Sequence, residues 1–309
     1  MNELLEKYQA INESFSKKLV FRLGIEAGFF SEYNNMILAM AYCLKHRIRF
    51  TLYSENAWFS HRGWTEFFEP FCDQETSRHH MLLNHREVPP PSGKRTMVIT
   101  AWTKLLHGID YFTWQLWAEF RNRETEQETF DIPELGIKGK LRDACRVLTD
   151  ITWRYNPDCQ NIINQFTESA SLPSRYVGFH IRGGDKFKED KLHPVGSYFN
   201  DMAIRTDCRN GFVLTDDYRI IETIRKEYPD WKIYTLCQEN ERGYYHQDFL
   251  KKDPEFIREQ TLRLFASTDI LLKSELFMGT FTSNPGMYLG MRMEPERCLG
   301  VNGTKWRLW

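Results

Sequence analysis

One short stretch in the second half of the chain concentrates residue types that could act on an anionic substrate. It runs from Arg175 to Asn200 and reads RYVGFHIRGGDKFKEDKLHPVGSYFN. Arg182 offers a planar fork of donors suited to phosphate oxygens, and Lys186 adds a second cation four residues later. Gly183 and Gly184 permit positive φ and a close approach of backbone to a ligand.

A carboxylate follows these cations, at Glu189 or Asp190. Two cations and a carboxylate are what an enzyme needs to move a sugar off a diphosphate. The cations stabilise negative charge that grows on the leaving group, and the carboxylate takes the proton of an acceptor hydroxyl. The same residues would also suit a charged, solvated surface loop with internal ion pairs, and local chemistry alone does not separate the two interpretations.

The elements that must position these residues alternate between strand and helix. We expect strands at 176–181, 211–215, 231–236 and 276–281, and helices near 194–207, 217–227, 254–267 and from 284 onward. This alternation predicts a parallel sheet with right-handed crossovers. Polar clusters follow three of the strands: Arg182–Lys186, Thr215–Asp217 and Thr280–Asn284. Because ligands bind outside the carboxyl ends of parallel strands, we expect neighbouring clusters to meet there.

The first half of the chain is less regular. Residues 18–60 suggest a βα unit: a strand KKLVFR, a glycine turn, a helix at 33–46 and a strand at 47–53. Gly28 or Ser31 could bind an anion at the start of that helix, although a plain structural turn is the simpler interpretation. The aromatic-rich segment 53–71 is a candidate wall of a sugar-binding cleft.

Further along, Thr96–Trp102 suggests a buried strand. Residues 104–123 and 140–170 suggest helices, with a charged connector from Glu124 to Gly139. The sequence SASLPS breaks the pattern near 165–174. We therefore expect two domains, 1–170 and 171–309.

Composition narrows the functional classes. The net charge is −1, so no global field favours nucleic acid or an anionic membrane. Seven scattered cysteines without a CxxC pair indicate free, mostly buried thiols in a reducing compartment. His79, His80 and His85 lack a fitting second cluster of ligands, so we expect no metal site. No apolar run approaches the ~20 residues of a membrane helix. We expect a cytoplasmic protein and leave open peripheral contact with a membrane.

The motif HIRGGDK followed by HP resembles the HxRRxDK…HP motif of the fucosyltransferase superfamily with the GT-B fold. That superfamily includes α-1,6-fucosyltransferases, nodulation fucosyltransferases and protein O-fucosyltransferases. The likeness continues in GFVLTDD at 211–217 and in ELFMGTFTSN at 275–284. It covers roughly residues 175–292 and is weak upstream.

The resemblance implies an α/β protein of two Rossmann-like domains facing across a cleft. Residues 1–170 would form the acceptor side, and 171–309 would bind the nucleotide sugar. It further implies an inverting, metal-independent transfer of fucose from GDP-fucose to a glycan acceptor, with no cofactor besides the donor.

The resemblance also assigns roles to individual residues. Arg182 matches the first arginine of the pair that grips the donor β-phosphate, and Lys186 matches the lysine near the leaving oxygen. His180 matches a histidine whose surroundings contact the base. Counted back from His193, Glu189 matches the catalytic base, whereas counting forward from Lys186 selects Asp190. Ser283 and Asn284 match a phosphate-contacting pair, and the remaining donor-binding candidates are Asp185, Asp216, Asp217, Asp269 and Thr282.

Two departures from the family pattern bear on the donor. Gly183 replaces the second arginine of the motif. The aspartate that reads guanine in the family would fall on Ser267, and Asp269 lies two positions later. A UDP-sugar enzyme on the same fold, such as a xylosyltransferase, therefore stays an alternative, as does a non-catalytic glycan- or nucleotide-binding protein.

Overall fold

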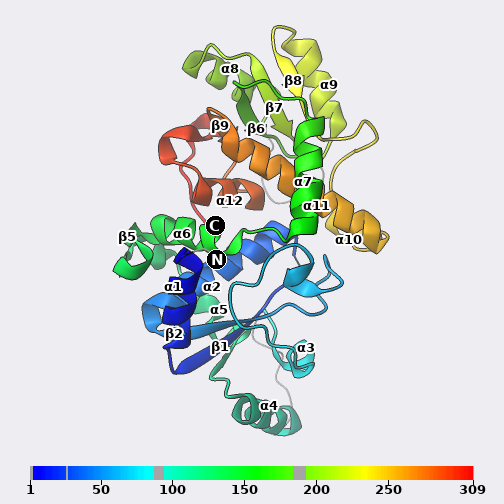
Figure 1. Cartoon of the computed structure of the whole chain (residues 1–309). Helices are drawn as coiled ribbons and strands as arrows, with labels where there is room; N and C mark the ends of the chain where they lie inside the picture. Colours follow the sequence, from blue (N-terminus) through cyan, green and yellow to red (C-terminus); the bar gives the residue numbers. More distant parts are fainter. Residues whose placement is uncertain (1–2, 26, 87–93, 184–192, 309) are drawn as a thin grey trace. The chain divides into compact units, whose positions relative to one another are not determined.

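The computed structural model describes residues 3–25, 27–86, 94–183 and 193–308 (Figure 1). The chain divides into two compact units, Met1–Asn156 and Pro157–Trp309. Each unit is an α/β structure built on a parallel sheet.

The sheet of the first unit has the strand order β2-β1-β3. Strand β1 (Lys17–Arg22) pairs in parallel with β2 (Ile48–Tyr53) and with the short β3 (Tyr111–Phe112). Helix α2 (Phe29–His46) connects β1 to β2, as the sequence predicts. The other elements of this unit are α1 (Glu3–Glu13), η1 (Gly63–Glu66), α3 (His79–Leu83), α4 (Lys94–His107), α5 (Thr113–Phe120), η2 (Arg123–Gln127), β4 (Thr129–Ile132), η3 (Pro133–Leu135), β5 (Ile137–Lys140) and α6 (Leu141–Thr152).

Aromatic side chains form the core beside α2. The rings of Tyr33 and Trp153 meet edge to face at 5.1 Å, and those of Trp64 and Phe68 stack at 4.4 Å. Most aromatic residues of segment 53–71 are buried in this core, including Phe59, Trp64 and Phe68. Their rings stabilise the first unit and do not form the open sugar-binding wall that the sequence suggested.

One assignment in the first half was wrong, and two others were incomplete. Thr96–Trp102 lies within helix α4, because a short apolar run does not by itself separate strand from helix. Residues 104–123 are only partly helical, with the end of α4, then β3 and α5. Residues 140–170 are helical as predicted, in the two helices α6 and α7. The connector 124–139 contains the antiparallel hairpin β4–β5.

The second unit contains a five-stranded, wholly parallel sheet in the order β10-β9-β6-β7-β8, which confirms the predicted sheet type. Its strands are β6 (Val177–His180), β7 (Asn210–Leu214), β8 (Lys232–Tyr234), β9 (Phe277–Gly279) and β10 (Cys298–Gly300). Its helices are α7 (Pro157–Ser169), α8 (Val195–Arg205), α9 (Tyr218–Glu227), α10 (His246–Phe249), α11 (Pro254–Lys273), α12 (Asn284–Arg292), η5 (Pro295–Arg297) and η6 (Val301–Gly303). Each predicted strand and helix of 175–292 therefore has a counterpart.

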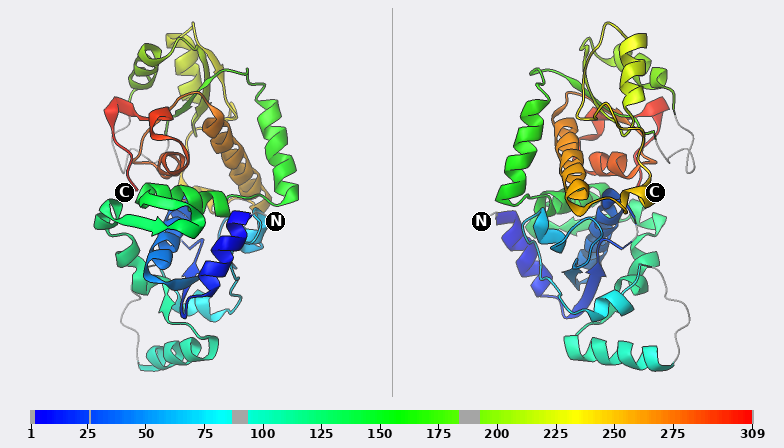
Figure 2. Two further views of the ribbon diagram at one scale, coloured as in Figure 1. Left: turned by 60° about the vertical axis from the view of Figure 1, so that its left-hand side comes forward. Right: turned by 90° about the vertical axis from the view of Figure 1, so that its right-hand side faces the viewer.

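Phe179 of β6 is central to the packing of this unit. Its ring stacks on Phe199 of α8 at 4.4 Å and meets Trp231 edge to face at 5.7 Å. The unit begins at Pro157 and so includes α7, which the sequence analysis placed in the first domain. Helix α7 lies alongside α11 (Figures 1 and 2), and this packing draws it into the second unit.

All seven cysteines are free, and six of them are buried, with Cys237 partly exposed. This confirms the expectation of free thiols. Within the described ranges, no helix is both long enough and apolar enough to cross a bilayer.

Candidate active site

Strand β6 leads into the candidate site and delivers Arg182 just beyond its carboxyl end. The Arg182 guanidinium pairs with the Asp216 carboxylate, with 3.6 Å between Nη1 and Oδ2. It also lies over the ring of Tyr244, 5.6 Å from the ring centre. Arg182 is thereby held by residues that follow β7 and β8, the two strands on one side of β6 in the sheet.

Asp216 joins three segments of the sheet edge. Its Oδ1 accepts a hydrogen bond from the Gly183 N–H at 2.7 Å, and its Oδ2 accepts one from the Tyr244 N–H at 2.8 Å. The register of the parallel strands brings this about, because His180 of β6 pairs with Leu214 of β7. The predicted meeting of the first two polar clusters is confirmed. Asp216 orients the backbone around Arg182.

Asp217 has a structural role at the start of α9. Its Oδ1 accepts a hydrogen bond from the Arg219 N–H at 3.0 Å, which makes it the N-cap residue. The Arg219 guanidinium also bonds the same carboxylate, and this contact holds the pKa of Asp217 below its ordinary value. Asp217 therefore stays ionised, stabilising α9 and orienting Arg219.

Gly183 stands where the motif has a second arginine, and the local packing favours glycine there. A Cβ at position 183 would lie 3.0 Å from the Cβ of Asp217 and 3.6 Å from Oδ1 of Asp216. A side chain would therefore press against Asp217, whereas its distance to Asp216 is an ordinary contact. The close approach of β6 to the β7–α9 turn thus accompanies the loss of the second arginine.

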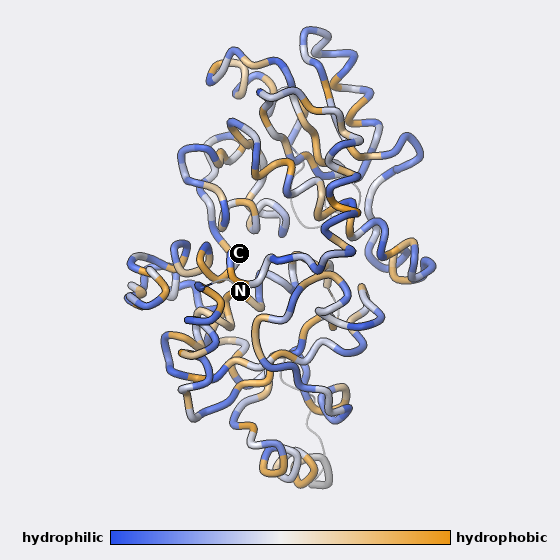
Figure 3. Tube along the Cα trace, viewed as in Figure 1, coloured by the Kyte–Doolittle hydropathy of each residue, from blue (hydrophilic) through white to orange (hydrophobic). Residues whose placement is uncertain are grey.

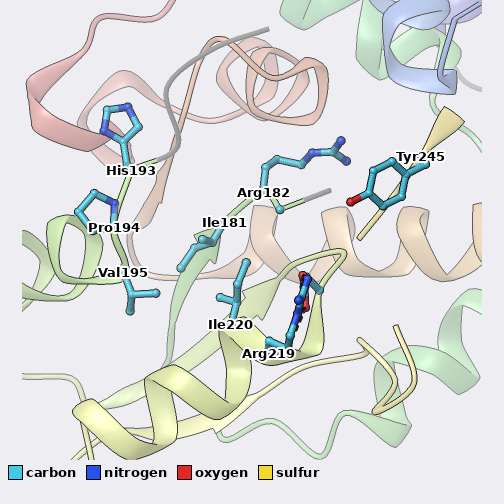
Figure 4. A pocket seen from close by; sticks show the side chains of 10 residues that line it. Ile181, Arg182, His193, Pro194, Val195, Arg219, Ile220 and Tyr245 are labelled. Atoms are coloured by element: carbon cyan, nitrogen blue, oxygen red, sulfur yellow. Dashed lines mark hydrogen bonds and ion pairs between the residues drawn. The ribbon is translucent and has the colours of Figure 1, made fainter. Parts of the chain in front are cut away.

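A pocket of about 380 Å³ opens beside Arg182 (Figure 4). Its size falls in the range of small-molecule sites. Figure 4 shows Arg182 and Tyr245 at one side, His193 and Pro194 at another, and Arg219 and Ile220 on α9. The lining residues are Ile181, Arg182, Gly183, His193, Pro194, Val195, Asp217, Arg219, Ile220 and Tyr245.

Helix α8 begins at this pocket. Pro194 is its N-cap, and Pro194 and Val195 both line the pocket. The first N–H groups of a helix lack partners inside the helix and carry partial positive charge, so a helix start of this kind attracts anions. Together with two arginines, it gives the pocket the character of a phosphate site.

The third polar cluster adjoins the other side of β6. His180 is only 2% exposed, and its Nδ1 lies 3.3 Å from the Ser283 Oγ. Ser283 is the N-cap of α12 and donates a hydrogen bond to the Thr280 carbonyl at 3.0 Å. This contact joins the third cluster to β6 through His180, which precedes the predicted cluster Arg182–Lys186. His180 and Ser283 are buried beneath the sheet edge. Thr282 and Asn284, on either side of Ser283, are partly exposed.

The positions considered for reading a base lie on α11. Ser267 is 3% exposed, and its hydroxyl donates a hydrogen bond to the Arg263 carbonyl at 2.8 Å, so this hydroxyl is bonded within α11. Asp269 is partly exposed. Two successive steps of ~100° place it on a different side of the helix from Ser267.

Four predicted residues, Asp185, Lys186, Glu189 and Asp190, lie outside the described residues. The chain on either side of them is described: Gly183 precedes them, His193 follows them, and both line the pocket.

Sequence reasoning missed Arg219, Tyr244 and Tyr245. A usable signal existed for the arginine, since it lies two residues after Asp217, at the start of a predicted helix on the sheet's carboxyl edge. The two tyrosines sit in the loop after β8, where the chain shows no regular pattern. Tertiary contacts assign them to the site: the Tyr244 N–H bonds Asp216, the Tyr244 ring lies against Arg182, and Tyr245 lines the pocket.

The glycine turn of the first unit is a structural turn. Glu32 of α2 is 3% exposed, and its carboxylate accepts hydrogen bonds from the N–H groups of Gly24 at 3.2 Å and Ala27 at 3.1 Å. An internal carboxylate therefore satisfies these two N–H groups of the turn. Among the described residues, no group of three or more His, Cys, Asp or Glu side chains could hold a metal ion.

The sequence matches no protein-family profile and no curated protein. Its structure is similar to solved fucosyltransferases. A NodZ α-1,6-fucosyltransferase soaked with GDP-fucose aligns with a TM-score of 0.52 and 13% identity, over 90% of this chain and 92% of that one. The same enzyme co-crystallised with GDP gives 0.51 and 14% over the same shares, and NodZ from Bradyrhizobium gives 0.50 and 15% over 88% and 91%. The chain thus has the GT-B fold of the fucosyltransferases, as the sequence resemblance implied.

Proposed function

We propose that this protein is a glycosyltransferase that transfers fucose from GDP-fucose to a hydroxyl group of a glycan. The observation that carries the proposal is the position of Arg182. It lines a pocket at the carboxyl edge of a parallel sheet in a GT-B fold, and Asp216 and Tyr244 hold its side chain. An oriented guanidinium at this edge suits the diphosphate of a nucleotide sugar.

Arg219 would supply the second cation that the motif lacks. It reaches the pocket from α9, whereas the family's second arginine follows the first along the chain. The bond to Asp217 fixes the direction of the Arg219 side chain, and the aspartate offsets part of its positive charge. The amide groups at the start of α8 add neutral donors, so the diphosphate would be bound without a metal ion.

The reaction would be a single displacement with inversion at the anomeric carbon. The acceptor oxygen forms its bond to that carbon while the bond to the donor's β-phosphate oxygen breaks. The hydroxyl proton passes to a carboxylate, for which the family motif favours Glu189 over Asp190. The electron pair leaves with the nucleoside diphosphate, whose charge Arg182 and Lys186 stabilise.

The first test is a thermal shift with GDP, UDP, ADP and CDP in parallel. A ligand at 100 times its dissociation constant adds about 2.7 kcal/mol to stability, which is readily measured. Stabilisation by GDP alone supports the proposed donor. Stabilisation by UDP alone reassigns it to a UDP-sugar. No stabilisation by any of the four favours a non-catalytic binding protein or a donor site that only the acceptor completes.

The second test separates the candidate bases. Glu189→Gln should leave GDP affinity unchanged and abolish transfer, while Asp190→Asn should retain transfer. The reverse result moves the base to Asp190, and turnover in both variants refutes the assignment of the base to Glu189 or Asp190. Transfer should also persist in EDTA. Activity lost in the chelator and restored by a divalent ion would refute metal independence.

A further inference from the structure

Helix α4 presents its apolar side chains outward. Six large apolar residues of this one helix are at least 39% exposed: Met97, Val98, Ile99, Trp102, Leu105 and Leu106. At ~100° per residue, all of them except Met97 fall within an arc of about 120°. A soluble protein rarely leaves so continuous an apolar stripe uncovered.

The polar side of the same helix faces the protein. Thr103 is only 4% exposed, and the Lys104 ammonium donates a hydrogen bond to the Asp110 carbonyl. The His107 carbonyl accepts a hydrogen bond from Lys18 Nζ at 3.3 Å, and the His107 ring lies 6.3 Å from that of His79 on α3. These polar contacts attach α4 to the first unit, and they orient the helix so that its apolar arc faces outward.

The charges around α4 indicate what covers this arc. The sequence of α4 contains Lys94, Arg95 and Lys104 and no acidic residue. Residues 75–110 contain five Lys or Arg against three acidic residues, Glu75, Glu87 and Asp110, although the whole chain has 41 basic and 42 acidic residues. A helix that combines basic residues with an exposed Trp and Leu face is typical of helices that lie in a membrane interface.

We propose that α4 docks the protein on an anionic membrane surface, with Trp102, Leu105 and Leu106 entering the headgroup–acyl boundary. A second copy of the chain fits this arc less well, because two basic segments would then face each other. Figure 3 shows the apolar positions distributed along α4. The protein should bind anionic lipids more tightly than neutral ones, because basic residues near the surface are attracted only to the anionic lipids.

The test uses the full-length protein and sedimentation with phosphatidylcholine vesicles, with and without phosphatidylglycerol. The protein should bind the anionic vesicles more tightly than the neutral ones, and added salt should weaken this binding. Leu105→Glu should reduce binding by about tenfold or more, because a leucine no longer leaves water and a negative charge is added.

Ile204→Glu is the matched control. Ile204 is 86% exposed on α8, so the substitution makes the same charge change at an exposed apolar site outside α4. It should leave vesicle binding unchanged. Both variants should melt at the wild-type temperature, since each changes a side chain that already lies in water.

If Leu105→Glu and Ile204→Glu reduce vesicle binding equally, net charge accounts for the binding and the role of α4 is refuted. Absence of wild-type binding, or equal binding to neutral vesicles, would overturn the anionic membrane assignment. A dimer in light scattering that Leu105→Glu dissociates, without vesicle binding, would assign the arc to a second copy. The vesicle assay needs no nucleotide-sugar donor, so its result does not depend on the proposed transferase activity.

Discussion

Asp216→Asn is the most informative single substitution in the candidate site. The native carboxylate accepts two backbone hydrogen bonds, from Gly183 at 2.7 Å and from Tyr244 at 2.8 Å, and it pairs with Arg182. Asparagine keeps the shape but has one acceptor oxygen. Its amide group would therefore meet one of the two N–H donors with a donor of its own.

The size of the effect follows from these contacts. A hydrogen bond to a charged group contributes about 1.5–3 kcal/mol, and the Asp216 side chain is only 14% exposed. We expect the free energy of unfolding to fall by about 2 kcal/mol. Because Arg182 also loses its charged partner, we expect GDP affinity to fall by about tenfold.

Urea unfolding and isothermal titration with GDP measure the two effects. Asp207→Asn is the control, since it removes the same charge from an exposed pair with Arg175 in the same unit. It should leave GDP affinity unchanged. If Asp216→Asn alters neither unfolding nor GDP affinity, the assignment of Asp216 as the organiser of the site is wrong.

Burial lowers the pKa of His80 to about 4. Between about pH 6.5 and about pH 4, the unfolded chain therefore binds a proton at this residue that the folded protein does not bind. The free energy of unfolding should fall by about 1.4 kcal/mol per unit as pH drops from about 6.5 to about 4, and an unchanged pH slope in His80→Gln would contradict this. Gly286→Ala should destabilise the protein by about 1–3 kcal/mol in urea unfolding, because its Cβ would lie 2.0 Å from the Thr280 carbonyl oxygen; wild-type stability would show that α12 shifts at little cost. Arg219→Gln should weaken GDP binding by about threefold to tenfold in titration, whereas Arg225→Gln, on the same helix but outside the pocket lining, should not, and equal effects would deny Arg219 a ligand contact.

Local patterns in the sequence predicted much of the second unit. Alternating strands and helices in 175–292 indicated a parallel sheet, and Asp217 stands at the start of a predicted helix, where aspartate is a common cap. These features depend on residues close together in the chain, such as an aspartate whose side chain bonds an N–H two residues later. Such signals are present in any short window of sequence.

The first half was predicted less well because its signals conflict. The apolar residues of Thr96–Trp102 suggested burial, yet those at 97–99 and Trp102 are exposed on α4. The polar residues Thr103 and Lys104 instead attach the helix to the first unit. Hydropathy alone could not show this inversion, because contacts with distant residues, such as the hydrogen bond from Lys18 to the His107 carbonyl, decide which face turns inward.

The sequence by itself determined the chemistry available at the site: an arginine beyond a buried strand, a glycine that leaves room beside it, and acidic residues beyond the next strand. Only the tertiary structure decided which of these residues meet. Strand pairing placed Asp216 against Gly183 and brought in Arg219 and Tyr245, which no motif identified. The physical reason is that strand order depends on hydrogen bonds between segments tens of residues apart, whereas hydrophobic periodicity and helix caps are local.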